Sequence, residues 1–543
     1  MLSTASIASP LKNHPSAYIA LHADDPINWH LWNAETLQTA RQQNKLILIS
    51  SGYFACHWCH VMHQENYQDP MVAELLNRHF ISVKIDRELL PDLDDYLLNL
   101  ARRATGQAGW PLHVILTPEG YGFSAFVYQP RDTLLNTLNQ LQSWWQTDAE
   151  TIRQLAQPPQ QAIADSHNPT QILADINQHF ADLIDSFEGG LNATQKFPHS
   201  PFLKHWLLRP QLDQQTAEWL IFTLEQMQSE HLYDHVHHGF FRYTVDPNWQ
   251  EPHFEKMLYD NAQLAEIYLL AAERFDRPDF LATAEQTLAY IERELMSPIT
   301  GLASASQSAI DQQGVDGGRY LWSRDALRQH LSSAEFDLVN QAWSLEQAPP
   351  FDAGWLPKPI DHQAWLSIQS KLAQRPSLTD DKQLLSWNGL LLSAYARAYG
   401  LTANTNYALQ AHSLSHRLIQ LLQLDPAPRA VSDQSLTFGN ATLEDYAFVL
   451  AGLRLWQSTA NLDLSATIQQ LVQTAEQKFK TPNGWIASIE SLLPGQQTPA
   501  SLPDLATPSA SAILECGQTT EIQIAAGLQA WQYASYLTYQ TCD

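Results

Sequence analysis

The hydrophobic pattern of this 543-residue chain changes character at about residue 155. Before that point, short apolar runs rich in β-formers alternate with segments of helical period, and the runs are KLILIS at 45–50, FISVKID at 80–86 and LHVILT at 112–117. Alternation of this kind predicts a layered α/β fold. After residue 170, helical patterns follow one another and strand signals almost vanish, which predicts an all-α region.

The stretch at 155–170, LAQPPQQAIADSHNPT, is rich in Pro, Gln and Asn and has no clear period in its first half. It predicts a linker. We therefore expect an α/β domain at 1–155, a linker at 156–170 and a helical domain at 171–543. Helices are expected near 171–187, 214–230, 257–275, 279–296, 323–331, 335–346, 361–374, 382–400, 405–424, 441–458, 463–480 and 520–540. This succession favours a helical toroid over a solenoid, because no fixed-period repeat is visible.

Charge and cysteine content exclude several classes of protein. Lys and Arg total 31 and Asp and Glu total 57, so the net charge is −26. This balance argues against a nucleic-acid or anionic-membrane partner. No apolar stretch approaches the roughly 20 residues that span a bilayer, and no signal peptide is apparent. The chain has 4 cysteines, too few for a disulfide scaffold. A soluble cytoplasmic protein is the expectation.

Two of the cysteines form a Cys-x-x-Cys motif, Cys56-His57-Trp58-Cys59, which follows the 45–50 strand by a five-residue turn and begins a helical stretch. A thiol at a helix N-terminus faces the positive end of the helix dipole, which stabilises the thiolate. The thiolate is the reactive form in thiol–disulfide exchange. This setting predicts Cys56 as the nucleophile and Cys59 as the resolving thiol.

Three other interpretations of the motif stay open. With His60 it reads Cys-x-x-Cys-His, the attachment signature of c-type haem, which requires an exported chain. Zinc could use both cysteines with His57, His60 or His63, but a second ligand pair is missing. Two inert buried thiols are the third alternative. The strand–turn–helix setting favours redox chemistry, and we predict no metal and no cofactor.

Trp110 and Pro111 directly precede the 112–117 strand. In thioredoxin-like folds, a cis-proline before a later strand packs against the dithiol. The sequence does not show whether this peptide bond is cis, because most X–Pro bonds are trans. We expect both residues to shape the groove that receives a protein disulfide or a small-molecule thiol.

Longer motifs resemble the spermatogenesis-associated protein 20 family over most of the chain. They are KLILISSGYFACHWCHVM at 45–62, LHA at 21–23 with Pro26, Trp29 and Trp32, IDRE at 85–88 with PD at 91–92, TG at 105–106 with GWP at 109–111, KFPH at 196–199, PHFEKMLYDN at 252–261, SWNG at 386–389 and EDYA at 444–447. The resemblance implies a thioredoxin-like domain followed by an (α/α)6 toroid similar to six-hairpin glycosidases and sugar epimerases. The activity of this family is largely unassigned, so the resemblance implies a fold more firmly than a function.

The chain departs from the family pattern at three places. Leu89 and Leu90 stand where the family has an acid and an arginine. An acidic motif expected after Gly301 is replaced by SASQS at 304–308, and a Pro-Ser-Gly-Asn motif is replaced by PSAS at 508–511. Because these positions are expected near the mouth of the toroid, carbohydrate chemistry in this chain is in doubt, whereas the dithiol is intact.

Polar residues of the helical region form the second candidate site. His253 and Glu255 are the first candidates, because sugar epimerisation needs an acid and a base near neutral pH, and His238 is the second histidine. Asp381 and Asp445 offer a carboxylate pair for glycosidase chemistry. The other expected ligand contacts are Tyr259, Asp260, Asn261, Trp387 and Asn388, with the Trp387 ring as a flat surface for a sugar.

Each of these residues also has a structural interpretation. Glu444 and Asp445 follow Thr442, so helix capping explains them without a ligand, and Asp380 and Asp381 can cap the next helix. The histidines at 231, 235, 237 and 238 resemble a metal cluster but lack a Cys or HExxH context. We therefore predict a thiol–disulfide module fused to a toroid that binds a carbohydrate-like molecule. The alternatives are a sugar isomerase or glycosidase and a non-catalytic scaffold.

Overall fold

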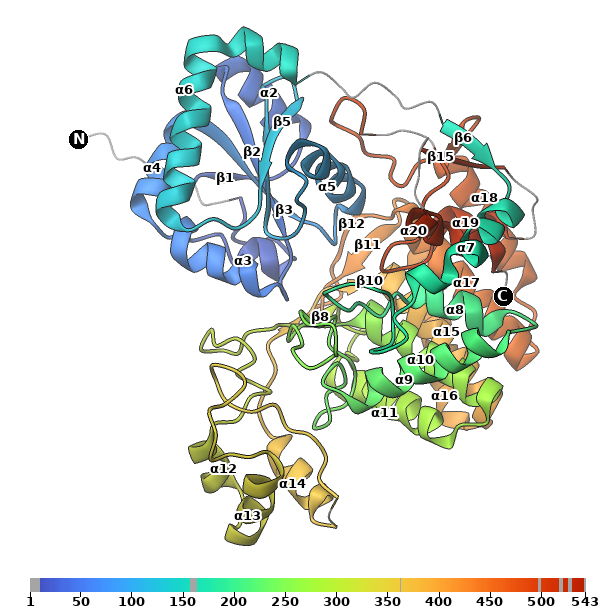
Figure 1. Ribbon diagram of the computed structural model, residues 1–543. Coiled ribbons are helices and arrows are strands. Elements are labelled where there is room, and N and C mark those ends of the chain that lie inside the picture. Colours follow the sequence, from blue (N-terminus) through green and yellow to red (C-terminus); the bar gives the residue numbers. More distant parts are fainter. Residues whose placement is uncertain are drawn as a thin grey trace. The chain divides into compact units, whose positions relative to one another are not determined.

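The computed structural model describes residues 10–156, 164–361, 363–496, 500–516, 521–525 and 530–541. The chain forms two compact units, which Figure 1 colours along the sequence. Unit 1 comprises Met1–Gln161, Leu436–Gly439 and Ile486–Pro499, and unit 2 comprises Ala162–Ser435, Asn440–Trp485 and Ala500–Asp543. The predicted division near residue 155 lies close to this boundary, but the two late segments of unit 1 were not predicted.

Unit 1 is built on a five-stranded sheet in the order β1-β3-β2-β4-β5. Its strands are β1 (Trp29–His30), β2 (Leu46–Gly52), β3 (Phe80–Asp86), β4 (Leu112–Leu116) and β5 (Gly122–Phe126). β1, β3 and β2 are parallel, whereas β4 runs antiparallel to β2 and β5. All seven residues of β2 and of β3 are buried, as expected of central strands covered on both faces.

Helices flank this sheet, with α4 and α6 along one side and α5 along the other (Figure 1). The helices of unit 1 are α1 (Ala17–Ala20), α2 (Ala34–Gln43), α3 (His57–Met62), the π-helical turn η1 (His63–Tyr67), α4 (Pro70–His79), α5 (Pro91–Thr105) and α6 (Arg131–Leu155). Asp69 caps α4 by accepting hydrogen bonds from the amides of Met71 and Val72, and Pro70 is its first residue.

One segment from late in the chain belongs to the core of unit 1. Leu493 is 4% exposed and joins the hydrophobic cluster of β2, β3, β4 and α5. Tyr96 donates a hydrogen bond to the carbonyl of Pro494 at 3.1 Å, and Gln496 donates one to Asp92 at 2.9 Å. Nothing in the local pattern near residue 490 indicates this association.

Unit 2 contains a closed ring of helices. Its inner members are α8 (Ser200–Leu208), α10 (Leu258–Phe275), α15 (Leu385–Thr402), α17 (Leu443–Ala460), α19 (Ala510–Glu515) and the 3-10 helix η2 (Ala534–Gln540). Each packs on the next in this order, and η2 returns to α8 and closes the ring. The predicted helical toroid is therefore confirmed.

Outer helices pack against the inner helices of this ring. α11 (Pro278–Glu294) packs on α10, α16 (Thr405–Leu422) on α15, and α18 (Ser465–Phe479) on α17. α7 (Pro169–Leu183) packs on η2 and on α20 (Ala530–Tyr533), and α9 (Gln214–Ser229) lies beside α10 and α11 in Figure 1. The inner helix α10 is buried over the 15 residues from Leu258 to Ala272, because it packs on all sides.

Short elements complete unit 2. α12 (Arg324–His330), α13 (Ser333–Ala342) and α14 (Trp365–Leu372) surround a separate hydrophobic cluster that includes Trp322, Leu327 and Ile368. Its short strands are β6 (Ala164–His167), β7 (Lys256–Met257), β8 (Ser306–Gln307), β9 (Thr379–Asp380), β10 (Gln383–Leu384), β11 (Pro428–Val431), β13 (Lys480–Thr481), β14 (Gly484–Trp485) and β15 (Ile522–Ala525). The remaining short strand, β12 (Thr437–Asn440), lies mostly in the Leu436–Gly439 segment assigned to unit 1.

The structure corrects several local predictions. In the predicted linker at 156–170, β6 pairs with β15 and α7 begins at Pro169, while residues 157–163 lie outside the described part. The helix predicted at 520–540 is β15 followed by α20 and η2. The helices α8 and α19 were missed; seven of the nine residues of α8 are buried, so no amphipathic stripe marks it. Among the described residues, no helix is long and apolar enough to cross a bilayer.

Candidate functional site

Cys56 and Cys59 lie where β2 passes into α3. Cys56 is the N-cap residue of α3, and its Sγ accepts a hydrogen bond from the backbone N–H of Cys59 at 3.2 Å. Cys56 and Cys59 are thiols rather than halves of a disulfide, and the residues are 3% and 2% exposed. A thiolate at Cys56 therefore faces the unpaired N–H groups of the helix start.

Sheet register brings Pro111 to the level of this dithiol. The Trp110–Pro111 peptide bond is cis. β4 pairs with β2 so that Leu112 lies opposite Ser51, which places Pro111 opposite Gly52. A Cβ atom on Gly52 would lie 2.7 Å from the Sγ of Cys59 and 2.2 Å from the hydroxyl of Tyr18. Only glycine leaves room for these two groups beside the strand.

Aromatic side chains surround the motif. The indole of Trp110 donates to both carboxylate oxygens of Asp94, at 3.1 and 3.2 Å, and its ring lies 4.0 Å below the guanidinium of Arg87. The Tyr53 ring meets the Trp110 ring edge-on at 5.8 Å. Trp58, between the two cysteines, is 43% exposed, so it is the part of the motif that solvent reaches most easily.

A buried lysine lies behind the thiols. Lys84 on β3 is 1% exposed; its Nζ is 3.1 Å from the Ser50 hydroxyl and 4.6 Å from the ring centre of Tyr67. Burial lowers the pKa of Lys84 to about 8, while the nearby Cys59 and Asp25 oppose the shift. A cation here favours a thiolate on either cysteine. Sequence reasoning missed it, and the only signal was a lysine inside an otherwise apolar strand.

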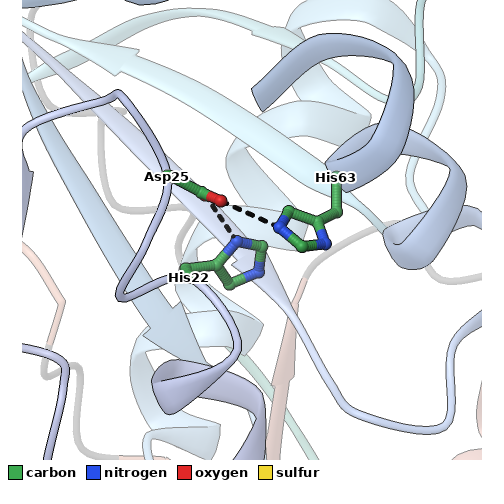
Figure 2. A group of neighbouring side chains, drawn as sticks. All are labelled: His22, Asp25 and His63. Atoms are coloured by element: carbon green, nitrogen blue, oxygen red, sulfur yellow. Dashed lines mark hydrogen bonds and ion pairs between the residues drawn. The ribbon is translucent and has the colours of Figure 1, made fainter. Parts of the chain in front are cut away.

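Three side chains of unit 1 that can bind a metal ion also meet, as Figure 2 shows. Both carboxylate oxygens of Asp25 are bonded: Oδ2 to Nδ1 of His22 at 2.8 Å and Oδ1 to Nε2 of His63 at 2.8 Å. The zinc ligands considered from the sequence, the two cysteines with a nearby histidine, do not come together like this. The Nε2 of His60 bonds the carbonyl oxygen of Phe54 at 2.7 Å, and His63 bonds Asp25 instead.

In unit 2, Asn261 and Asn388 occupy the same place at the start of two inner helices. Asn261 accepts from the amide of Phe240 at 2.7 Å and donates to the carbonyls of Phe240 and Met257. Asn388 accepts from the amide of Ala303 at 2.8 Å and donates to the carbonyls of Ala303 and Leu384. Both residues are 0% exposed. Each amide therefore ties a loop to the first turn of its helix.

Asp445 has a similar role at the start of α17. It accepts from the backbone N–H groups of Ser386 and Thr442 at 2.9 and 2.7 Å, and from Arg429 at 2.9 Å. It is the N3 residue of a capping box with Thr442, as the alternative interpretation from sequence states.

His253 and Glu255 form the polar centre of the predicted ligand site. The Nδ1 of His253 lies 2.8 Å from Oε1 of Glu255, and Nη1 of Arg242 lies 3.5 Å from Oε2. Arg242 also donates to the hydroxyl of Tyr259 at 3.0 Å, and the Tyr259 ring lies 4.8 Å from that of Trp387. The structure thus brings five polar and aromatic side chains from loops, α10 and α15 into one connected group.

The remaining predicted residues lie in different surroundings. His238 has a left-handed backbone with φ of 65°, and its Nδ1 lies 3.0 Å from the Tyr233 hydroxyl. Burial lowers the pKa of His238 to about 4, so it is neutral at physiological pH. Asp260 is buried in the first turn of α10, whereas Asp381 is exposed before β10.

A cavity of about 70 Å³ lies inside the ring, and sequence reasoning missed it. Buried Glu266 of α10 bonds Lys204 of α8 at 3.1 Å and Arg397 of α15 at 3.2 Å. The other polar residues that line the cavity include Ser200, His205, Gln263, Ser393, Arg454 and Thr538. Pro508, from one of the departing motifs, also lines it. The motif at 304–308, which also differs from the family pattern, contains β8, and this strand pairs with β7 and β9.

The sheet, the dithiol and the ring of helices define a protein that joins a thioredoxin-like unit to a helical toroid. Residues 8–164 match the family model described as "Thioredox_DsbH: Protein of unknown function, DUF255". The chain is similar in sequence to spermatogenesis-associated protein 20, as its motifs indicate. It is 28% identical to that protein from Homo sapiens, over 82% of this chain and 67% of the relative.

Two further comparisons complete this picture. An uncharacterized protein of Caenorhabditis elegans, B0495.5, is 26% identical over 89% of this chain and 76% of its own length. Among solved structures, the cellobiose 2-epimerase of Spirochaeta thermophila is 12% identical and covers 62% of this chain and 75% of its own, with a TM-score of 0.42.

Proposed function

We propose that unit 1 is a thiol–disulfide oxidoreductase module that uses Cys56 and Cys59. The observation that supports this most directly is the hydrogen bond from the Cys59 amide to the Cys56 Sγ at the start of α3. The Cys56 thiolate attacks one sulfur of a substrate disulfide, forms a mixed disulfide and releases the other sulfur as a thiolate, which takes a proton. Cys59, after losing its proton, then attacks the Cys56 sulfur and releases the second substrate thiol. The substrate is reduced and the dithiol becomes a disulfide.

The surroundings of the dithiol suggest how this reaction is controlled. Lys84 supplies a buried positive charge that stabilises whichever thiolate is present, and Pro111 and Trp110 form part of the substrate groove. Because both cysteines are almost completely buried, the module selects disulfides that can enter beside Trp58. A protein disulfide or a small-molecule thiol in the cytoplasm remains the proposed partner.

Reductase activity and trapping test this proposal together. Wild-type protein should reduce insulin disulfides in the presence of dithiothreitol, and Cys56→Ser should be inactive. Cys59→Ser should retain the nucleophile and accumulate a mixed disulfide visible on a non-reducing gel. The control His79→Gln changes a side chain on α4, away from the motif, and should behave as wild type. Indistinguishable rates for wild type and Cys56→Ser would refute the redox function.

As a second function, we propose that unit 2 binds a carbohydrate-like small molecule beside Tyr259 and Trp387. This proposal is supported by the contact between the two rings, which lie next to the ion-paired side chains of Arg242, Glu255 and His253. Aromatic faces and charge-assisted hydrogen bonds are the means by which proteins hold sugar rings and their hydroxyls. If the site is an isomerase, His253 is the acid–base group, with Glu255 orienting it.

A panel of mono- and disaccharides tests the second function by product analysis and thermal shift. A ligand should raise the Tm of the wild type, and Trp387→Phe should weaken the shift. Trp343→Phe, in the separate cluster of α12–α14, is the matched control. If no sugar gives either turnover or a thermal shift, sugar binding is refuted and a scaffold role for the toroid is favoured.

A further inference from the structure

The group of His22, Asp25 and His63 is built from two parts of unit 1 that are distant in sequence. His22 and Asp25 lie in the loop between α1 and β1, whereas His63 is the first residue of the π-helical turn η1 (Figure 2). The candidate ligand atoms all lie within 4.8 Å of one another. π-helical turns occur mostly as single-turn bulges in α-helices, frequently at functional sites, and here His63 at the start of the turn contacts Asp25.

The chemistry of these donors selects a class of ion. Two imidazole nitrogens and one carboxylate form a set typical of Zn²⁺ and other first-row divalent ions. Ca²⁺ and Mg²⁺ prefer oxygen ligands throughout, so this set disfavours them. The side chains of His22 and Asp25 are 0% exposed and that of His63 is 14% exposed, so the site is closed on most sides.

The present distances fit an ion after a small rearrangement of the three side chains. Ligands of a tetrahedral Zn²⁺ lie about 2.0–2.2 Å from the metal and hence about 3.4 Å from one another. The two contacts of Asp25 with the histidines are 2.8 Å long, as hydrogen bonds. One ion would take one carboxylate oxygen of Asp25, so one 2.8 Å contact would lengthen by about 0.6 Å. The other donor atoms, now within 4.8 Å of one another, would close to about 3.4 Å. Neutral imidazoles accommodate this by carrying their proton on the other ring nitrogen.

A fourth ligand and a supporting contact are also in place. The side-chain nitrogen of Gln68 lies 3.0 Å from Nε2 of His63 and 2.5 Å from Oδ1 of Asp25. The two ends of a glutamine amide have the same shape, so its rotation brings the oxygen to the same place. The indole of Trp29 donates to Oδ2 of Asp25 at 2.8 Å, the kind of outer contact that orients a ligating carboxylate.

We propose that His22, Asp25 and His63 form a binding site for a divalent transition ion, Zn²⁺ above all, with Gln68 or water as the fourth ligand. The ion would join the loop before β1 to the helical segment α3–η1, which also begins with the dithiol. Its role is structural, because the three side chains are almost completely buried and neither cysteine is a ligand. This site is independent of the proposed redox and sugar functions.

Zinc titration of the chelator-stripped full chain, in competition with a chromophoric chelator, tests the proposal. Wild type should bind one equivalent that depends on the histidines, and the Cys56→Ser/Cys59→Ser double variant should retain it. His63→Gln should bind at least about 100-fold more weakly, since a ligand contributes more than an outer contact does. His79→Gln is the matched control and should bind as wild type.

Two further measurements separate this site from zinc held by the dithiol. Co²⁺ in the wild type should give the visible bands of a four-coordinate ion without the charge-transfer band of a thiolate ligand. Zn²⁺ should raise the Tm of the wild type but not that of His63→Gln or Asp25→Asn, because an ion that binds only the folded state stabilises it. Circular dichroism of the ion-free variants confirms that they fold, and the partly exposed position of His63 makes its variant the more tolerant.

Three outcomes would overturn the proposal. They are the absence of a stoichiometric zinc site in the wild type, loss of the bound ion in the double cysteine variant, and unchanged zinc affinity in a folded His63→Gln protein. Because none of these readouts involves disulfide reduction, a negative result here leaves the redox proposal standing. A Cys56→Ser protein as active as wild type would refute the redox proposal and leave the ion site standing.

Discussion

Replacement of Asn388 by alanine tests whether this residue holds the toroid together or binds a ligand. The side chain makes three hydrogen bonds of 2.8 to 3.0 Å to the backbone of Ala303 and Leu384, and the residue is 0% exposed. Each buried hydrogen bond contributes about 1 kcal/mol, and each buried partner left unsatisfied costs about 1–3 kcal/mol. We therefore expect Asn388→Ala to lower the free energy of unfolding by about 4 kcal/mol.

Differential scanning calorimetry of the full chain measures this effect. The unfolding entropy grows with size, and unit 2 is larger than 250 residues, so about 1.3 °C of Tm is lost per kcal/mol and its transition should fall by about 5 °C. Asn261→Ala should fall similarly, because Asn261 makes the same three kinds of bond at the start of α10. Asn177→Ala is the control, since Asn177 is exposed on α7 and alanine favours a helix.

The result that would refute this reasoning is specific. Asn388→Ala protein that unfolds at the wild-type temperature but loses a sugar-induced thermal shift would place Asn388 in the ligand site. The backbone bonds of Ala303 would then be replaceable by water, contrary to the burial of this residue.

Three other predictions concern packing and charge. Leu493→Ala should destabilise unit 1 by about 2–5 kcal/mol in chemical unfolding, whereas Leu505→Ala, at a residue 50% exposed, should have almost no effect; equal effects would contradict the place of Leu493 in the core. Gly389→Ala should lower stability by about 3 kcal/mol or more, because its Cβ would lie 2.5 Å from the Val449 amide, and Gly400→Ala in the same helix should be milder. Between pH 8 and 10 the unfolded state holds the Lys84 proton more tightly than the folded state, whose Lys84 pKa is about 8, so stability should rise with pH by up to about 3 kcal/mol. Lys84→Met, compared in a background without the two thiols, should abolish this rise, and an unchanged rise would show that Lys84 is not buried as a charge.

The sequence predicted the strands at 45–50, 80–86 and 112–117 and most helices of unit 2 to within a few residues. These elements follow from local periodicity, because a strand or an amphipathic helix shows its buried face in consecutive residues. Local reasoning failed for α8, a helix of nine residues of which seven are buried, and for β15, which pairs with the distant strand β6.

For the sites, the sequence alone determined the Cys-x-x-Cys motif and its place between a strand and a helix, since both are properties of consecutive residues. Only the tertiary structure brought Lys84 behind the thiols, placed Pro111 opposite Gly52, and joined His22 and Asp25 to His63, because these contacts link separate elements. It also showed that Asn261, Asn388 and Asp445 are bonded to backbone groups of other segments, Asp445 among them to the first turn of α15. A sequence motif does not show whether the partner of its polar residue is a ligand or the backbone. Only the folded chain distinguishes the two.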